Sequence, residues 1–251
     1  MSNRDEERFT QERQRLADEI ERQGIRDPAV MDAMRSVPRE AFLPPRLHEF
    51  AYRNAPLPIG NEQTISQPFV VALMTAALEL DSGDRVLEIG TGSGYAAAIL
   101  GQIVQEVYTV ERYRELAEKA RACLEKEGYT NVHVLHGDGT EGWPEYAPYD
   151  AIIVAAGAPA APPPLLDQLR VGGRLVIPVG RHRNVQELLR IRKRGDGDYK
   201  EESLGGVRFV PLVGTSGWND NPMDPARTSP HSSNCSPQAR ATDWLSSGTV
   251  P

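Results

Sequence analysis

Three closely spaced glycines follow a run of strand-forming residues and mark the first segment that can bind a small molecule. Val86-Leu-Glu-Ile89 leads into Gly90-Thr-Gly-Ser-Gly94, and Tyr95 follows. Glycines between a strand and a helix permit positive φ and let the backbone approach a ligand closely. A dinucleotide site requires Gly-x-Gly-x-x-Gly, with its third glycine at position 95. The spacing here is Gly-x-Gly-x-Gly instead, although a turn of purely structural role can also have it.

Two carboxylates strengthen the prediction of a nucleoside site. Glu111 ends the next predicted strand, roughly 20 residues beyond the turn, where a carboxylate can accept both ribose hydroxyls. Asp138 follows the third predicted strand and can accept the adenine amino group. Either residue alone is consistent with a helix cap or a solvated loop. Their placement at successive strand ends favours binding.

The glycine turn, preceded by Glu88, resembles the first motif of class I methyltransferases. This resemblance implies S-adenosyl-L-methionine as cofactor, S-adenosyl-L-homocysteine as product, and no metal. The residues expected to bind the cofactor are Thr64, Glu88, Gly90, Thr91, Gly92, Gly94, Glu111, Asp138 and Gly139.

A second motif indicates the reaction. Gln63-Thr-Ile-Ser-Gln-Pro68 resembles the signature of the protein-L-isoaspartate O-methyltransferase family, and 37–42, 150–154 and 207–213 resemble further family stretches in the same order. The likeness covers about residues 12–218. It implies an enzyme that methylates the carboxylate of isoaspartyl residues in damaged proteins and peptides, for repair.

The resemblance places the catalytic serine of the family on Ser66. An isoaspartyl carboxylate is ionised at neutral pH, so methyl transfer needs no general base. The enzyme must instead remove water from the carboxylate and aim one oxygen at the methyl group, and a hydroxyl donor suits this role. Ser66 can also be the N-cap of a helix that begins at Pro68. The two roles are compatible.

The same resemblance assigns the remaining substrate residues. Thr64 and Ile65 are expected to form a wall of the methyl-transfer site. Backbone groups of Pro211, Leu212 and Val213 are expected to contact the substrate peptide. Backbone recognition suits an enzyme that accepts damage in many sequence contexts.

The order of elements predicts an α/β fold: a doubly wound, mainly parallel seven-stranded sheet with helices on both faces, Rossmann-like as in class I methyltransferases. The last two strands have no helix between them and are expected to form an antiparallel pair at the sheet edge. The predicted strands are 85–89, 106–110, 131–135, 150–154, 173–178, 186–193 and 207–213. The predicted helices are 8–23, 69–80, 95–103, 113–127 and 164–169. A further helix is predicted to follow Asp27, which would be its N-cap.

Composition divides the chain into three parts. Residues 1–67 are expected to form a small N-terminal helical cap and a substrate-site segment. Residues 68–218 form the cofactor-binding core. Residues 219–251 are rich in Pro, Ser, Asn and Thr and are predicted to be a disordered tail.

Bulk properties restrict location and partners. The net charge of −7 argues against broad binding to nucleic acid or anionic membranes. No apolar run approaches the roughly 18 residues of a membrane span, and the charged start resembles no secretory signal. Cys123 and Cys235 form no disulfide framework, which suits a reducing compartment. We expect a cytoplasmic monomer.

Three alternative functions are open on the sequence alone. A tailoring enzyme could methylate aspartate or isoaspartate in one dedicated precursor peptide, with the tail recruiting that peptide. A noncatalytic S-adenosylmethionine-binding module is another alternative. A nucleic-acid methyltransferase would draw on the basic run 190–194. We interpret those cations instead as a solvated strand edge that blocks strand addition.

Overall fold

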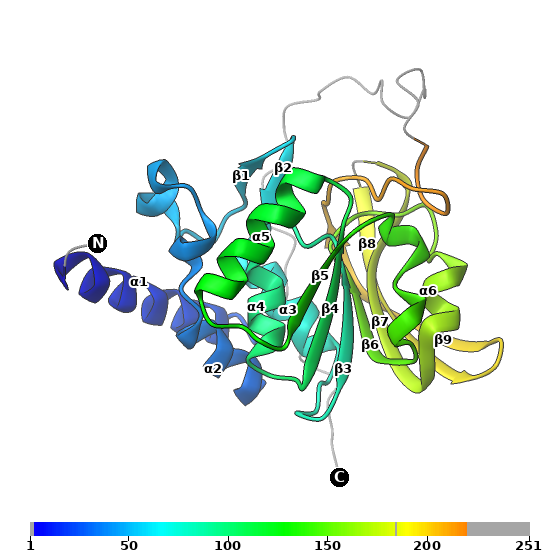
Figure 1. The fold of residues 1–251 in the computed structure, drawn as a ribbon. Coiled ribbons are helices and arrows are strands. Elements are labelled where there is room, and N and C mark those ends of the chain that lie inside the picture. Colours follow the sequence, from blue (N-terminus) through cyan, green and yellow to red (C-terminus); the bar gives the residue numbers. More distant parts are fainter. Residues whose placement is uncertain (1–2, 184, 220–251) are drawn as a thin grey trace, which may run out of the picture.

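A seven-stranded sheet forms the centre of the structure, a computed structural model that describes residues 3–183 and 185–219. Its strands are β3 (Arg85–Ile89), β4 (Glu106–Glu111), β5 (Val132–His136), β6 (Tyr149–Val154), β7 (Leu169–His182), β8 (Val185–Gly195) and β9 (Asp198–Val207). Their order across the sheet is β5-β4-β3-β6-β7-β8-β9 (Figure 1). The pairs from β5 to β7 are parallel, whereas β8 and β9 are antiparallel additions. The predicted fold class is confirmed.

Helices cover both faces of this sheet (Figure 1). α3 (Pro68–Ala77), α4 (Tyr95–Gly101) and α5 (Arg114–Lys126) lie on one face, and the short α6 (Pro163–Gln168) lies on the other. Side chains alternate along each strand. Val86 of β3 therefore joins the core under α3 to α5, while Leu87 joins the core on the α6 face.

The first fifty residues form the predicted cap of helices. It consists of α1 (Asn3–Arg22), α2 (Pro28–Ser36) and two 3₁₀ turns, η1 (Arg39–Phe42) and η2 (Pro45–Phe50). The Asp27 side chain accepts a hydrogen bond from the Val30 amide at 3.1 Å, as predicted for an N-cap. Leu16, Ile20 and Met34 belong to the same apolar core as α3 and α4. The cap therefore packs on the face that α3 to α5 cover.

The predicted position of the last strand is wrong. The structure places β9 at Asp198–Val207, and residues 208–213 lie outside it. Gly195 pairs with Asp198 across a two-residue turn in which Gly197 has φ 74°, so β8 continues directly into β9. β9 is largely exposed, and this is why its polar sequence gave no strand signal. Residues 208–218, the crossing segment, pass back over the carboxyl ends of the central strands.

The interpretation of the basic run as a solvated edge is also wrong. β8 lies between β7 and β9, so it is not an edge strand. Arg190 pairs with Glu79 at 2.7 Å and with Glu202 at 2.6 Å, and Arg192 contacts Glu79 at 2.5 Å. Ile191 points to the opposite face and is buried. These cations therefore join β8 to β9 and to the end of α3.

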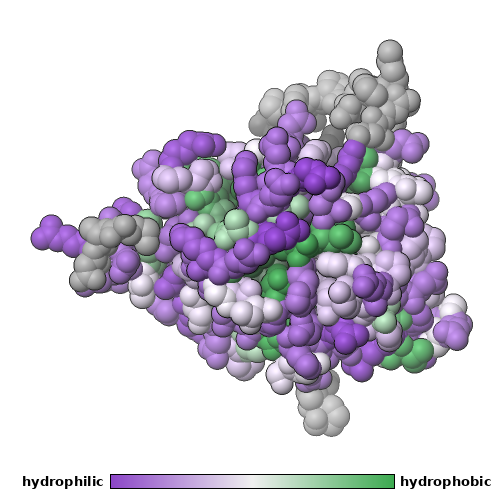
Figure 2. Space-filling view, viewed as in Figure 1, coloured by the Kyte–Doolittle hydropathy of each residue, from purple (hydrophilic) through white to green (hydrophobic). Residues whose placement is uncertain are grey.

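The surface in Figure 2 is mostly hydrophilic, with hydrophobic residues gathered near its centre, where β4 and β5 lie between α5 and α6. β5 is the edge strand there, and its side chains are only partly buried. Within the described ranges, no helix is long and apolar enough to cross a membrane. The predicted tail lies outside the described residues from position 220 onward.

Candidate active site

A cavity lies at the carboxyl ends of β3, β4 and β6, where ligands bind in open α/β sheets. The glycine turn, the end of β4, the segment before α3 and the crossing segment form its walls. Eleven predicted site residues line it: Thr64, Ile65, Ser66, Gly90, Thr91, Gly92, Glu111, Gly139, Pro211, Leu212 and Val213. Glu88, Gly94 and Asp138 are not among the lining residues.

The glycine turn adopts the backbone conformation that its sequence predicts. Gly90, Gly92 and Gly94 have φ values of 96°, 55° and 91°. Gly94 precedes α4, and a Cβ there would lie 3.3 Å from the Leu124 side chain of α5. Gly94 therefore lets α4 begin close to α5, while Gly90 and Gly92 face the cavity.

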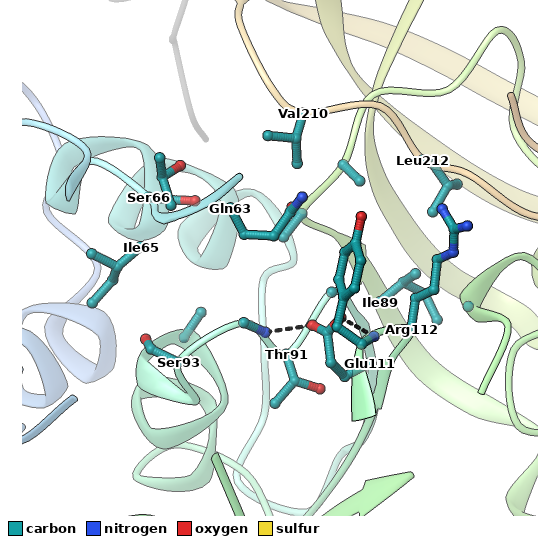
Figure 3. A pocket seen from close by; sticks show the side chains of 18 of the residues that line it. Gln63, Ile65, Ser66, Ile89, Thr91, Ser93, Glu111, Arg112, Val210 and Leu212 are labelled. Atoms are coloured by element: carbon teal, nitrogen blue, oxygen red, sulfur yellow. Dashed lines mark hydrogen bonds between the residues drawn. The ribbon is translucent and has the colours of Figure 1, made fainter. Parts of the chain in front are cut away.

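Glu111 is held at the cavity by the backbone. Its carboxylate accepts hydrogen bonds from the Gly92 amide at 2.8 Å and from the Tyr113 amide at 2.9 Å (Figure 3). The side chain is only 5% exposed, so its orientation is fixed before any ligand binds. Each oxygen keeps acceptor capacity for a ribose hydroxyl.

Glu88 lies beneath the turn rather than on the cavity wall. It points to the face of β3 opposite Ile89, which lines the cavity. Thr109 donates to Glu88 at 2.5 Å, and the hydroxyls of Thr109 and Thr91 are 2.6 Å apart. Burial raises the pKa of Glu88 to about 8. The residue therefore supports Thr91 through Thr109 and is largely protonated at neutral pH.

We expect Glu88→Gln to remove a pH dependence of stability. With a pKa of about 8 in the folded protein and an ordinary value of 4.5 in the unfolded chain, Glu88 takes up a proton on folding between these pH values. The free energy of unfolding of the wild type should then fall, relative to that of the variant, as pH rises from 5 to about 8, and level off above. Urea unfolding at several pH values measures this difference. Parallel curves for the two proteins would show that Glu88 is not a neutral buried acid.

Asp138 joins the strand ends to the crossing segment. One oxygen accepts from the Thr140 amide at 2.9 Å and hydroxyl at 2.7 Å, and the other from the Thr215 amide at 2.8 Å and hydroxyl at 3.0 Å. Burial raises the pKa of Asp138, but these hydrogen bonds outweigh it and leave the pKa below its usual value. A carboxylate has about four acceptor sites, so none is free here. Its role toward adenine stays a prediction.

Asp138→Asn should loosen the crossing segment. An amide presents donors to Thr140 or Thr215 where the carboxylate accepts, so hydrogen bonds are lost. We expect the free energy of unfolding to fall by about 1–3 kcal/mol, with weaker cofactor binding. Chemical denaturation and calorimetry measure the two effects. The exposed Asp167→Asn is the matched control, and equal stability of both variants would contradict this role.

Ser66 and Glu111 lie on opposite sides of the cavity, with Gln63 between them (Figure 3). A short hairpin of β1 (Leu57–Gly60) and β2 (Gln63–Ile65) leads into Ser66. The predicted N-cap role of Ser66 is not seen. Gln67 occupies the cap position of α3, and no side-chain hydrogen bond caps that helix. The hydroxyl of Ser66 is therefore not used in capping.

The crossing segment is fixed to the loop after β6. The Gly157 amide donates to Val210 O at 2.8 Å, and Gly157 O accepts from the Leu212 amide at 2.8 Å and from Trp218 Nε1 at 2.9 Å. These bonds place Leu212 and Val213 on the cavity wall, outside any strand, and their contact with a substrate peptide stays a prediction.

Several lining residues were not predicted. They come from positions beside the predicted residues, so a wider window around each motif would have found most of them. Among the residues that the structure describes, no group of three or more His, Cys, Asp or Glu side chains could hold a metal ion. The additional lining residues include Gln63, Ser93, Tyr95, Arg112, Tyr113, Ala155, Ala156 and Val210.

Comparisons with known proteins agree with this geometry. Residues 11–217 match the family model of protein-L-isoaspartate(D-aspartate) O-methyltransferase. Protein-L-isoaspartate O-methyltransferase 2 of Pelobacter propionicus is 64% identical over 203 residues, which are 81% of this chain and 90% of that protein. A solved protein-L-isoaspartate O-methyltransferase superposes with a TM-score of 0.74 at 32% identity, covering 82% of this chain and 67% of the other.

A second solved structure, an isoaspartate methyltransferase from Plasmodium falciparum in complex with S-adenosyl-L-homocysteine, has a TM-score of 0.70 at 25% identity. It covers 80% of this chain and 98% of its own. The sheet, the glycine turn and the carboxylate at the end of β4 define a class I methyltransferase. Within that class, the chain belongs to the protein-L-isoaspartate(D-aspartate) O-methyltransferase family. The sequence predicted this family and its enzyme class, a protein carboxyl methyltransferase, and both predictions are confirmed.

Proposed function

We propose that this protein transfers a methyl group from S-adenosylmethionine to the carboxylate of isoaspartyl residues in damaged proteins and peptides, for repair. The observation that carries the proposal is one cavity with Glu111 on one side and Ser66 on the other (Figure 3). The first side suits the ribose of the cofactor, and the second suits the reacting carboxylate. The names of the relatives support the same reaction.

The cavity fits the cofactor chemically. Gly90 and Gly92 leave room for a ligand beside the turn, and Glu111 presents fixed acceptors for hydroxyls. S-adenosylmethionine, when bound, supplies a methyl group on a positively charged sulfur. The protein binds, orients and excludes water, while Ser66 donates a hydrogen bond that aims one carboxylate oxygen. No residue needs to remove a proton, because the substrate is already ionised.

We also infer how the chain divides these tasks. Residues 1–67 carry the substrate side of the site, and residues 68–218 bind the cofactor, with Thr64 shared between the two. Backbone groups near Leu212 and Val213 contact the peptide. We propose that the enzyme acts as a cytoplasmic monomer without nucleic-acid or membrane partners, which its net charge of −7 supports. Light scattering on the purified protein tests the monomer.

Labelled methyl transfer to matched peptides tests the activity. Pairs of peptides of one sequence, containing either aspartate or isoaspartate, should differ sharply, with label only in the isoaspartyl member. Several unrelated sequences should serve as substrates, because the site recognises backbone. Transfer confined to one sequence would favour a dedicated tailoring enzyme, and absence of transfer with intact cofactor binding would favour a binding module.

A further inference from the structure

Arg39, in η1, is a fully buried cation directly behind Ser66. Its side chain is 0% exposed, and its Nη2 donates to the backbone carbonyl of Ser66 at 2.9 Å. The guanidinium carbon lies 4.8 Å from the centre of the Tyr95 ring. Both Ser66 and Tyr95 line the cavity, whereas Arg39 does not. The guanidinium therefore contacts the site from behind its wall.

The charge of Arg39 is not neutralised. Among the described residues, Arg39 forms no ion pair, and its Nε and Nη1 have no hydrogen-bond partner. The neighbouring Glu40 instead accepts from Tyr52 and faces Arg13 at 4.0 Å. Burial lowers the pKa of Arg39 to about 10, so the group stays protonated at neutral pH.

A buried cation without a counter-ion is strongly unfavourable, and an apolar residue of similar size would ordinarily be more stable there. The site offers a partner for the missing charge, because the proposed substrate is a carboxylate. A direct ion pair would reduce the nucleophilicity of that carboxylate. A cation one peptide group away attracts the anion without contacting it.

We propose that Arg39 is a positioning residue that fixes the Ser66 peptide group and whose uncompensated charge attracts the isoaspartyl carboxylate into the cavity. This inference rests on the proposed function. If the guanidinium lies about 8 Å from the substrate carboxylate, at an effective dielectric constant near 20, their attraction raises the affinity for the isoaspartyl peptide roughly 10- to 50-fold. The effect is specific for an anion. A neutral carboxamide in the same position gains nothing from the charge.

The test compares two peptides of one sequence, an isoaspartyl peptide and its carboxamide analogue. Their dissociation constants are measured by calorimetry on the protein saturated with S-adenosyl-L-homocysteine. Arg39→Met should weaken binding of the isoaspartyl peptide roughly 10- to 50-fold, change binding of the carboxamide less than about threefold, and leave cofactor affinity unchanged. Arg35→Met removes a half-buried cation of the same cap that is paired with Asp18 and Glu21, and it should change binding of neither peptide.

Equal weakening of both peptides by Arg39→Met would overturn the proposal, because Arg39 would then only shape the wall. If Arg39→Met does not fold, the same two dissociation constants are measured for Arg39→Lys, which keeps the positive charge but loses the planar guanidinium group. The proposal then requires the ratio of the two dissociation constants to stay within about threefold of the wild type, and a larger change overturns it. Binding is measured without turnover. Failure of the proposed activity would appear separately, as absent methyl transfer by the wild type.

Discussion

Ser66→Ala should lower kcat by roughly 10- to 1,000-fold, comparable at the upper limit to the loss of one preorganised donor elsewhere. The affinity for S-adenosylmethionine should stay nearly unchanged, because the hydroxyl acts on the carboxylate in the transition state. The structure supports this separation, since Ser66 lies across the cavity from Glu111 and does not cap α3 (Figure 3). Steady-state kinetics with an isoaspartyl peptide, together with calorimetry of the cofactor, measure both quantities.

The matched control is Ser82→Ala, which removes an exposed hydroxyl from the turn before β3 and should be fully active. The rate of the wild type should vary little between pH 6 and 8, because the nucleophile is ionised throughout that range. A rise with the slope of one proton would point to a general base. Full activity of Ser66→Ala would remove Ser66 from the reaction.

Glu111→Ala should weaken S-adenosylmethionine binding by about 1.5–3 kcal/mol, the range for hydrogen bonds to charged groups, or roughly 10- to 150-fold. The variant loses the acceptors for the ribose and also frees the Gly92 and Tyr113 amides, which shape the turn. Titration calorimetry gives the dissociation constant. Glu115→Ala, an exposed carboxylate on the first turn of α5, should bind like the wild type.

Glu111→Gln separates the loss of the carboxylate that binds the ribose from the disturbance of the glycine turn. The amide keeps the size of the side chain and can accept from one backbone amide, so the turn is disturbed less than in Glu111→Ala. A large loss in both variants assigns the effect to the carboxylate itself. Unchanged affinity in a folded Glu111→Ala protein would show that the ribose binds elsewhere.

The sequence predicted those parts of the fold that have a local signal. The buried strands were found because both of their faces are apolar, and β3 was placed at its observed bounds, Arg85–Ile89. β9 was misplaced because an exposed edge strand carries polar residues at most positions. The apolar stretch 207–213 looked more like a strand than β9 did, but only Val207 pairs in the sheet, and the part after it is bonded to the loop after β6.

The motifs predicted most of the residues that line the cavity, whereas the contacts that hold those residues in place join distant parts of the sequence. The donors from Thr215 reach Asp138 across 77 positions of sequence. The contact of Arg39 with Ser66 spans 27 positions. The chain of hydroxyls from Glu88 to Thr91 requires β3 and β4 to be paired in register. Such relations follow from the packed structure, and no local pattern encodes them.

The attachment of the crossing segment has a consequence for hydrogen exchange. This segment is held by hydrogen bonds to Asp138, Gly157, Gln186, Thr140 and Glu141, but Leu212 is its one buried apolar side chain in the described part of the chain. Segments with few buried contacts open more readily than the core. The amides of Leu212 and Trp218 should therefore exchange faster than those of β3 and β6, and the bound cofactor should slow them selectively. An opening of this segment would expose the cavity wall at Leu212 and Val213 while the sheet stays intact.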